Sequence, residues 1–520
     1  MRRLSALLSG LIAPISLITP GATATTQAAQ PRSTISWAPC PEDPAVECGT
    51  LTVPVDWSRP SNGTFEVGVA RRKATDPAAR IGALVLGAGG PGGSGVELVL
   101  GSPQELSPEV LRRFDIVGLD PRGTNRSHPV VCSTDLMAQA PDPLMKSQAD
   151  FDRMLAFNDR LRADCRARTG PLFDHVDSLS TAADLDAFRA ALGEDKLTYW
   201  GGSYGTLLGQ LYAERYPSRV RAFVLDSTMD HSLGTQGFMD TETWGAQDAF
   251  NEFVAWCERD NRCLQHGKDL RSIWRGLLDR ADRGELPMPG DPDTRLTAFQ
   301  LISSAAGAFY DPANWLPLSQ LIADLESGRT PGADALPPAI DRTQAQEVSP
   351  NAFQIFCLDF RLPVRDYREF SKHLRRLGKI APDMRYSPLS IGPVVSCLGQ
   401  PDPIPNPQHR LKVRTDTPVL VLNSLHDPAT VYPWALGTTK QLGRSGRLLT
   451  YEGWGHIVYG RGACATEATD AYLISRTLPV PGTRCPAVPP AEARTLRKPV
   501  TPQPGTPGWD AFRSLRMSFG

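Results

Sequence analysis

The sequence predicts an α/β fold, in which a mostly parallel central sheet with flanking helices is interrupted by a large, mainly helical insertion. Several apolar runs, such as "ALVL" from Ala83, lack polar alternation, which is typical of strands covered on both faces. Helix-like stretches separate some of these runs, as in a parallel sheet. The pattern stops after Ser227 and resumes at Thr417, so we expect one interrupted sheet, because the two late strands need neighbours that bury them. Two independent domains are the alternative.

Eight short runs are the expected strands. In chain order they are "LTVPV" from Leu51, "FEVGVARR" from Phe65, "IGALVLGAGG" from Ile81, "FDIVGLD" from Phe114, "KLTYW" from Lys196, "VRAFVLDS" from Val220, "TPVLVLNS" from Thr417 and "GRLLTYEGWGH" from Gly446.

Two helices are expected around the middle strands. The first has Thr181 as its N-cap with Asp184 three residues later, and it ends at Gly193. The second follows Ser203, and Gly205 and Gly209 give it a small-residue face that can lie close to a sheet.

Composition excludes some classes of protein. With 520 residues the chain can form one large core plus insertions. It is 41% hydrophobic and 21% charged with a net charge of -1, which is ordinary for a globular protein. The lack of a basic excess argues against nucleic acid as a partner.

The N-terminus resembles an export signal. Two arginines precede an apolar stretch from Leu4 to Ile18, and the small residues Gly21 to Ala24 follow. This order predicts a secretory signal peptide over residues 1–29 and a protein that is secreted or associated with the cell envelope. The stretch is short and contains prolines, so we expect no stable membrane span, and a membrane anchor is the alternative.

Ten cysteines are expected to form disulfides, because an even number of cysteines in an exported chain indicates oxidised pairs. The sequence does not fix their connectivity, and the simplest proposal joins neighbours: Cys40 with Cys48, Cys132 with Cys165, Cys257 with Cys263, Cys357 with Cys397, and Cys464 with Cys485. No spacing typical of zinc ligands is present, so we expect neither a metal nor another cofactor.

The segment "GGSYG" from Gly201 to Gly205 follows an apolar run and precedes a helix-like stretch. Its G-x-S-x-G pattern is typical of a nucleophile elbow, a tight strand-to-helix turn that exposes a serine hydroxyl. Ser203 is therefore the predicted nucleophile. An ordinary Gly-rich loop is the alternative.

An elbow serine needs a histidine base and an acid that orients it. Asp427 follows the strand "VLVLNS", and His456 follows "RLLTYE", so both lie just past strand ends, where parallel sheets place their sites. Their order along the chain matches the order Ser, Asp, His. Asp226 and Asp230 compete with Asp427 for the role of acid.

The oxyanion of such a reaction needs backbone donors. We expect the amides of Tyr204, Gly89 and Gly90 as donors, and the two glycines lie in the Gly-rich run "LGAGGPGGSG" after the strand "ALVL". Such a run can also bind phosphate, but it lacks the lysine of a P-loop.

These segments resemble the secreted tripeptidyl aminopeptidases and related proline iminopeptidases of the α/β-hydrolase superfamily. The resemblance rests on "GGPGGSG" (89–95), "DPRG" (120–123), "DLDAFRAALGEDKLTYWGGSYGT" (184–206), "HDPAT" (426–430) and "GHIV" (455–458). It implies an α/β-hydrolase fold with the triad Ser203, Asp427 and His456 and with a lid formed by the insertion. It also implies release of short peptides from the N-terminus of peptide or protein substrates that carry a free amine.

The sequence departs from the family pattern at three places. Gly87 and Ala88 stand where Asn-Pro is usual, Asn125 stands where glycine is common, and Val431 stands where proline is usual. None of these changes removes a proposed catalytic group.

Five regions are therefore expected. They are the signal peptide (1–29), the first part of the α/β-hydrolase core (30–229), the helical lid (230–412), the C-terminal part of the core, which resembles the tripeptidyl aminopeptidases (413–486), and a Pro-rich tail (487–520).

An aminopeptidase must also bind a cationic amine, for which a carboxylate near the lid is the simplest group. Asp359, Glu242 and Asp248 are the candidates. A carboxylesterase that uses the same triad and a non-catalytic cell-envelope protein with the same fold are the alternative functions. The sequence leaves open the length of the released peptide, the side-chain preference and the oligomeric state.

Overall fold

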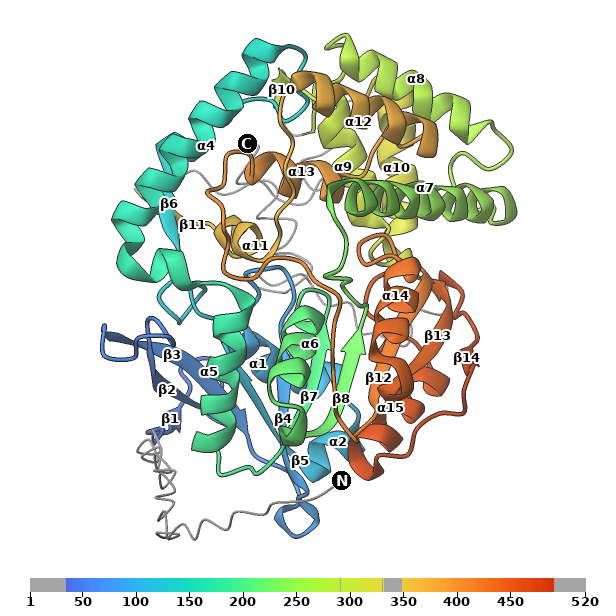
Figure 1. Cartoon of the computed structure of the whole chain (residues 1–520). Coiled ribbons are helices and arrows are strands. Elements are labelled where there is room, and N and C mark those ends of the chain that lie inside the picture. Colours follow the sequence, from blue (N-terminus) through green and yellow to red (C-terminus); the bar gives the residue numbers. More distant parts are fainter. Residues whose placement is uncertain (1–33, 290, 330, 332–347, 491–520) are drawn as a thin grey trace, which may run out of the picture. The chain divides into compact units, whose positions relative to one another are not determined.

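A computed structural model describes residues 34–289, 291–329, 331 and 348–490 (Figure 1). The predicted signal peptide lies outside these residues, as does the tail after Pro490.

A ten-stranded sheet forms the centre of the described chain. In spatial order its strands are β1 (Ala38–Pro39), β2 (Glu47–Pro54), β3 (Thr64–Arg72), β5 (Phe114–Leu119), β4 (Gly82–Gly87), β7 (Leu197–Gly202), β8 (Val220–Asp226), β12 (Val419–His426), β13 (Gly446–Trp454) and β14 (Arg484–Cys485). The pairs from β1 to β5 are antiparallel, and every pair from β5 to β14 is parallel. All eight predicted runs form strands, and β12 pairs directly with β8, so the expectation of one interrupted sheet is confirmed.

Helices cover both faces of this sheet (Figure 1). One core contains alternate strand residues such as Val85, together with residues of α5 (Ser178–Ala191), α6 (Gly205–Arg215) and α14 (Tyr432–Leu442). The other contains the neighbouring residues such as Leu84, with α1 (Gly95–Glu105), α2 (Pro108–Arg113) and α15 (Ala463–Ser475). Because both faces are buried, the strands are continuous apolar runs.

The insertion between β8 and β12 is mainly helical. Its elements are α7 (Thr235–Arg259), α8 (Leu270–Asp282), β9 (Pro287–Met288), β10 (Asp291–Arg295), α9 (Ala298–Ala308), α10 (Trp315–Glu326), β11 (Val348–Pro350), α11 (Phe353–Asp359), α12 (Tyr367–Ile380) and α13 (Pro388–Ser396). We call residues 230–412 the cap.

An earlier segment packs against the cap. It consists of β6 (Val131–Ser133), α3 (Thr134–Met137) and α4 (Gln148–Thr169), and β6 pairs with β11. The amide of Asn158 on α4 donates hydrogen bonds to the carbonyls of Val395 (2.8 Å) and Leu398 (3.1 Å). A segment that precedes Ser203 in sequence therefore packs against the cap.

The helix before β7 begins one turn earlier than predicted. Its N-cap is Asp177, which accepts a hydrogen bond from the Ser180 N–H (2.8 Å), whereas Thr181 lies inside the helix. The expected capping partner, Asp184, instead forms a buried ion pair with Arg122 (2.6 Å). The predicted end is close, because Gly193 adopts a φ of +76° just after the helix.

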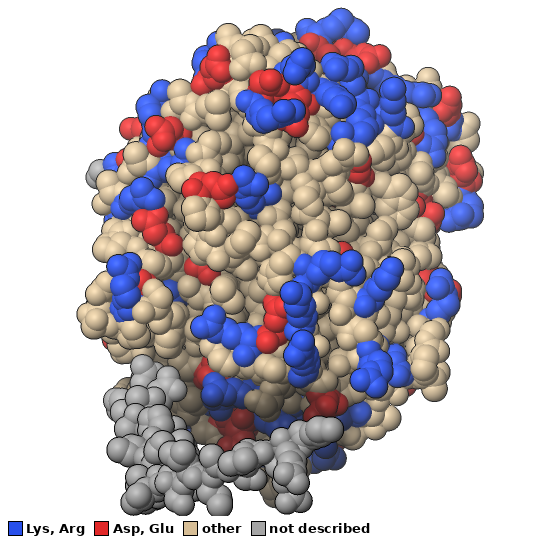
Figure 2. Space-filling view, in the orientation of Figure 1, with Lys and Arg blue, Asp and Glu red and all other residues tan. Residues whose placement is uncertain are grey.

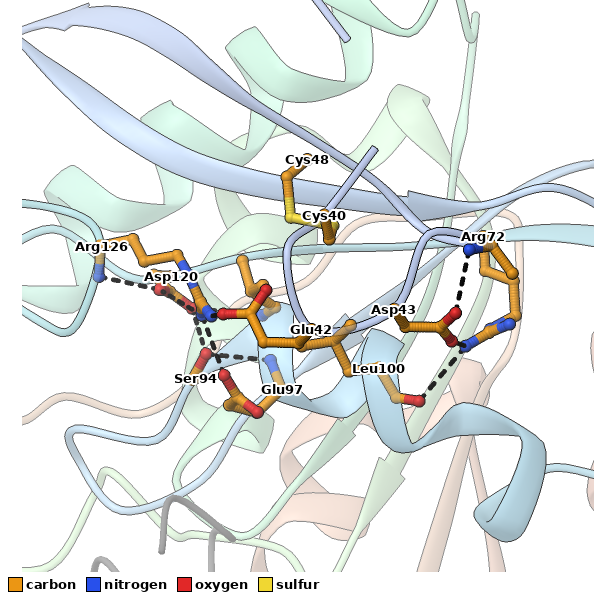
Figure 3. The surroundings of a disulfide bond; sticks show 12 residues. Cys40, Glu42, Asp43, Cys48, Arg72, Ser94, Glu97, Leu100, Asp120 and Arg126 are labelled. Carbon is orange, nitrogen blue, oxygen red and sulfur yellow. Dashed lines mark hydrogen bonds and ion pairs between the residues drawn. A yellow bond between two sulfur atoms is a disulfide. The ribbon is translucent and has the colours of Figure 1, made fainter. Parts of the chain in front are cut away.

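The structure contains all five neighbour pairings of cysteine, and it has no free cysteine in the described residues. Figure 3 shows the first, Cys40 with Cys48, in a loop where Glu42 meets Arg126 (2.7 Å) and Asp43 meets Arg72 (2.6 Å). These ion pairs tie the loop to strand β3 and to the segment after Asp120.

None of the helices in the described ranges is both long and apolar enough to cross a membrane.

Candidate active site

Ser203 lies in the two-residue turn between β7 and α6, with a φ of +56°, which is unusual for a residue that carries a side chain. The turn is tight. A β-carbon on Gly201 would lie 2.6 Å from the carbonyl oxygen of Gly205, and one on Gly205 would lie 2.4 Å from that of Gly87. Only glycine fits at these two positions, which gives a physical reason for the G-x-S-x-G pattern.

The Gly-rich loop after β4 contacts this serine. A β-carbon on Gly89 would lie 2.8 Å from Ser203 Cβ and 3.3 Å from Ser203 Oγ, so the Gly89 backbone lies directly against the serine side chain. Gly90, with a φ of +114°, turns the loop, and the N–H of Gly93 closes it onto the carbonyl of Gly89 (3.0 Å).

At each of the three places where the sequence departs from the family pattern, the structure shows a specific contact with a neighbouring residue. Tyr199 fills the space beside Gly87, because a β-carbon there would lie 1.8 Å from the tyrosine hydroxyl. Asn125 donates a hydrogen bond to the carbonyl of Gly92 in the Gly-rich loop (3.0 Å). Val431 packs against Gly245 of α7, where a β-carbon would lie 2.1 Å from its Cγ1.

His456 and Asp427 form a buried pair. His456 Nδ1 lies 3.0 Å from Asp427 Oδ1 and 3.1 Å from Oδ2. The carboxylate also accepts bonds from the N–H groups of Ala429 and Thr430 (both 2.9 Å). Burial alone would raise the pKa of Asp427, but the His456 imidazole and these donors hold that pKa below its usual value.

Asp226 connects the serine turn with the histidine loop. Its carbonyl accepts the N–H of Ser203 (2.9 Å), and its two carboxylate oxygens accept the N–H groups of Val458 and Tyr459 (both 2.8 Å). Burial raises the pKa of Asp226 to about 6, against the effect of these two bonds. Asp226 thus binds backbone groups and not the imidazole.

Two further contacts bring the loops together. The Ile457 N–H donates to Ser227 Oγ (2.8 Å), and a β-carbon on Gly202 would lie 2.9 Å from the side chain of Ile457. The residues that flank Ser203 and His456 in sequence are therefore in contact. The other competing acid, Asp230, accepts a hydrogen bond from the Ser232 N–H (2.9 Å). It does not bind His456.

The cap also holds His456. The carbonyl of Tyr310 accepts the His456 N–H (2.9 Å), and the two rings meet edge to face with centroids 5.0 Å apart. The guanidinium of Arg461 donates to the carbonyls of Tyr310 (2.9 Å) and His456 (2.8 Å). Sequence reasoning missed Tyr310 and Arg461, because neither belongs to a motif and Tyr310 is far from His456 in sequence.

Asp359 is saturated with hydrogen bonds. It accepts from the Ser178 N–H (2.9 Å), the Ser178 hydroxyl, Asn406 Nδ2 (2.8 Å) and the hydroxyl of Tyr204 (2.7 Å). Burial, with Asp177 nearby, raises the pKa of Asp359 to about 7. This carboxyl holds the side chain that follows the predicted nucleophile.

Asp248 also has a hydrogen-bond partner in the structure. It accepts a hydrogen bond from His426 Nδ1 (2.8 Å), and Glu252 lies 4.0 Å from the other ring nitrogen. Although burial opposes it, the bond to Asp248 raises the pKa of His426. The pair joins α7 to the end of β12, one residue before Asp427.

Glu242 is the third predicted amine receptor. It lies on α7, is 2% exposed, and accepts one long hydrogen bond from the hydroxyl of Ser387 (3.3 Å). Burial and the negative charge of Asp427 raise the pKa of Glu242 well above its usual range. The described residues contain no group of three His, Cys, Asp or Glu side chains with the geometry of a metal site.

Comparison with known proteins identifies the family. Residues 82–463 match the family model described as alpha/beta hydrolase fold. The chain belongs to the α/β-hydrolase family. It is 33% identical over 480 residues to "Serine protease Hip1" from Mycobacterium tuberculosis, covering 87% of this chain and 91% of that protein.

Two further relatives carry other names. "Tripeptidyl aminopeptidase" from Streptomyces lividans is 29% identical, with 85% of each chain covered. "Carboxylesterase B" from Mycobacterium tuberculosis is 31% identical, with 86% of this chain and 89% of that protein covered. The predicted fold, the resemblance to a serine peptidase family and the prediction that the chain is an enzyme are confirmed.

Proposed function

We propose that this α/β-hydrolase is an exported aminopeptidase that releases short N-terminal peptides through the triad Ser203, His456 and Asp427. The observation that carries the proposal is the buried His456–Asp427 pair on a loop that contacts the serine turn. The relatives named as a serine protease and a tripeptidyl aminopeptidase support a peptide substrate. The apolar N-terminal stretch and the five disulfides support a secreted or envelope location.

The proposed chemistry is acyl transfer to water. The Nδ1–H group of His456 donates a hydrogen bond to the Asp427 carboxylate, which leaves Nε2 free to take the proton of Ser203 as the hydroxyl attacks the amide carbonyl. The N–H groups of Tyr204, Gly89 and Gly90 stabilise the oxyanion, and His456 returns the proton to the leaving amine. Water then hydrolyses the acyl-enzyme.

Glu242 is the proposed receptor for the substrate amine. Asp359 already accepts four hydrogen bonds and Asp248 is bonded to His426, whereas Glu242 has one long bond and unused acceptor capacity. A cationic amine would favour the ionised form of this buried carboxyl, and the Coulomb attraction between them would be strong away from water.

The test compares three substrates on the purified mature chain: a tripeptide anilide with a free amine, the same anilide with an acetylated amine, and a short acyl ester. An aminopeptidase cleaves the first far faster than the second. Equal cleavage of both anilides rejects amine recognition, and preference for the ester supports the carboxylesterase alternative that one relative's name raises. Failure of a fluorophosphonate to label Ser203 would reject the triad itself.

A further inference from the structure

Positive charge is concentrated in one short part of the cap. Residues 361–380 contain seven Lys or Arg and two Asp or Glu, a net charge of 7 − 2 = +5, in a chain whose net charge is -1. Most of this segment is α12.

Four of the cations lie on one face of α12. Arg368, Lys372, Arg375 and Lys379 are separated by four, three and four residues, so they follow one stripe of the helix, and all four are exposed. The opposite face, which contains Phe370 and Leu377, is buried in the cap. The orientation of α12 is thus fixed with its cations toward solvent. We call these four residues the basic face.

The basic face has no anionic partner among the described residues. The other three cations of the segment do: Arg361 pairs with Asp402 (2.6 Å), Arg365 with Glu369 (2.9 Å) and Arg376 with Asp240 (2.6 Å). For the basic face, the structure gives a single side-chain hydrogen bond, from Arg375 to the hydroxyl of Ser371 (3.2 Å). Four positive charges therefore remain available to an external anion.

A large aromatic side chain is exposed on the neighbouring helix. Trp244, 42% exposed, lies one turn along α7 from Asp240, the residue that binds Arg376 of α12. Figure 2 shows Lys and Arg side chains gathered over α12 and α8 at the top of the view. Basic side chains and an exposed Trp on neighbouring helices are typical of protein surfaces that lie on lipid headgroups.

We propose that the basic face docks the protein on the anionic headgroups of a lipid bilayer. Its charges are spread evenly along a helix and not gathered in a pocket, which suits a diffuse layer of negative charge better than a single bound ion. The apolar side of α12 is already buried in the cap, so the helix does not insert, and the attachment is reversible and electrostatic.

The experiment measures co-sedimentation of the mature chain with two kinds of vesicle, phosphatidylcholine alone and phosphatidylcholine mixed with phosphatidylglycerol. We expect binding to the anionic vesicles only, weakened by added salt. The variant K372Q/R375Q should bind about thirty-fold more weakly, because each cation near an anionic surface contributes roughly fivefold. Its thermal unfolding should match that of the wild type, since both side chains are exposed.

The matched control is K440Q/R444Q, which removes one exposed lysine and one exposed arginine near α14. It should bind like the wild type. The proposal is overturned by equal binding to both vesicles, by equal loss in the control, or by full binding of R368Q/K372Q/R375Q/K379Q. Binding to a soluble anionic polymer such as polyglutamate without any preference for the anionic vesicles also overturns it. Hydrolysis of a small soluble substrate should be unchanged in every variant, whichever reaction the enzyme catalyses.

Discussion

The carbonyl of Tyr310 accepts the backbone N–H of His456, and its ring lies against the imidazole with centroids 5.0 Å apart. One residue of the cap therefore positions the histidine of the core. The cap and the loop that carries His456 are directly bonded at this point.

Replacing Tyr310 with Ala should lower kcat by about ten- to a hundredfold, because the imidazole loses the ring that limits its movement and small displacements of a reacting group are costly. Tyr310→Phe should keep most of the activity, since the ring remains and the described residues offer its hydroxyl no hydrogen bond. Steady-state kinetics on a soluble peptide anilide distinguish the two variants. Equal activities of Y310A and Y310F would show that the ring does not position His456.

Replacing Gly89 with Ala should reduce kcat by about a hundredfold or more, because its β-carbon would collide with Ser203 and displace the loop that carries the proposed oxyanion donors. The control is Gly101→Ala in α1, where a β-carbon meets nothing within 4 Å. Activity of G101A should equal that of the wild type. If G89A also retained full activity, the Gly-rich loop would have no part in the reaction.

Glu242→Gln should lower kcat/KM for a free-amine tripeptide anilide by about a hundredfold, the scale expected when one partner of a buried charge pair is lost. The acetylated anilide should be cleaved no more slowly than by the wild type. The ratio of the two rates is the measurement, and Glu258→Gln, at an exposed position near the end of α7, is the control. An unchanged ratio in E242Q contradicts amine recognition at this residue.

Asp184→Asn should destabilise the fold by about 3–5 kcal/mol, because the buried Arg122 guanidinium loses its charged partner. Arg122 belongs to the segment "DPRG" and Asp184 begins the segment "DLDAFRAALGEDKLTYWGGSYGT", so this ion pair joins two of the segments that carry the family resemblance. Chemical denaturation measures the change, with the exposed Asp195→Asn as control. A loss in D184N no larger than in D195N would contradict the role of the pair.

Asp359 should make stability depend on pH. Its pKa is about 7 in the folded protein and near 3.8 in the unfolded chain, so the folded state binds the proton more tightly. The resulting stabilisation is complete below pH 4 and is lost as pH rises to 7, by up to about 4 kcal/mol. In Asp359→Asn this part of the dependence should disappear, whereas the parts that come from Asp226 and Glu242 should remain. Denaturation of both proteins between pH 4 and 8 measures it, and parallel curves would refute the assignment. Asp226 adds a smaller effect of the same sign.

The sequence predicts the strands well, because buried parallel strands follow a local rule, and the proposed triad rests on the same rule. Buried parallel strands are continuous apolar runs, and Ser203, Asp427 and His456 each follow the end of such a run. The residues that surround the proposed site do not follow such local rules. Tyr310 reaches His456 through a backbone carbonyl, which any residue possesses, so no side-chain pattern marks it.

The three amine candidates illustrate the same limit. In sequence Asp359, Glu242 and Asp248 are equivalent acidic residues within the cap. They differ in the number of donors around each carboxyl, and those donors come from distant segments such as Ser178 and Asn406. The start of α5 differs from the prediction for a related reason, because Asp184 pairs with Arg122 of another motif and not with its own helix end.

The disulfides have a consequence for how substrates enter and products leave. Every one of the five joins two cysteines on the same side of the boundary between residues 230–412 and the rest of the chain. No disulfide crosses this boundary, so apart from the chain itself it is held by non-covalent contacts such as the hydrogen bond from Trp434 Nε1 to Thr241 Oγ1 (2.8 Å). The disulfides therefore stiffen each side of the boundary separately and place no covalent restraint on movement between the two sides.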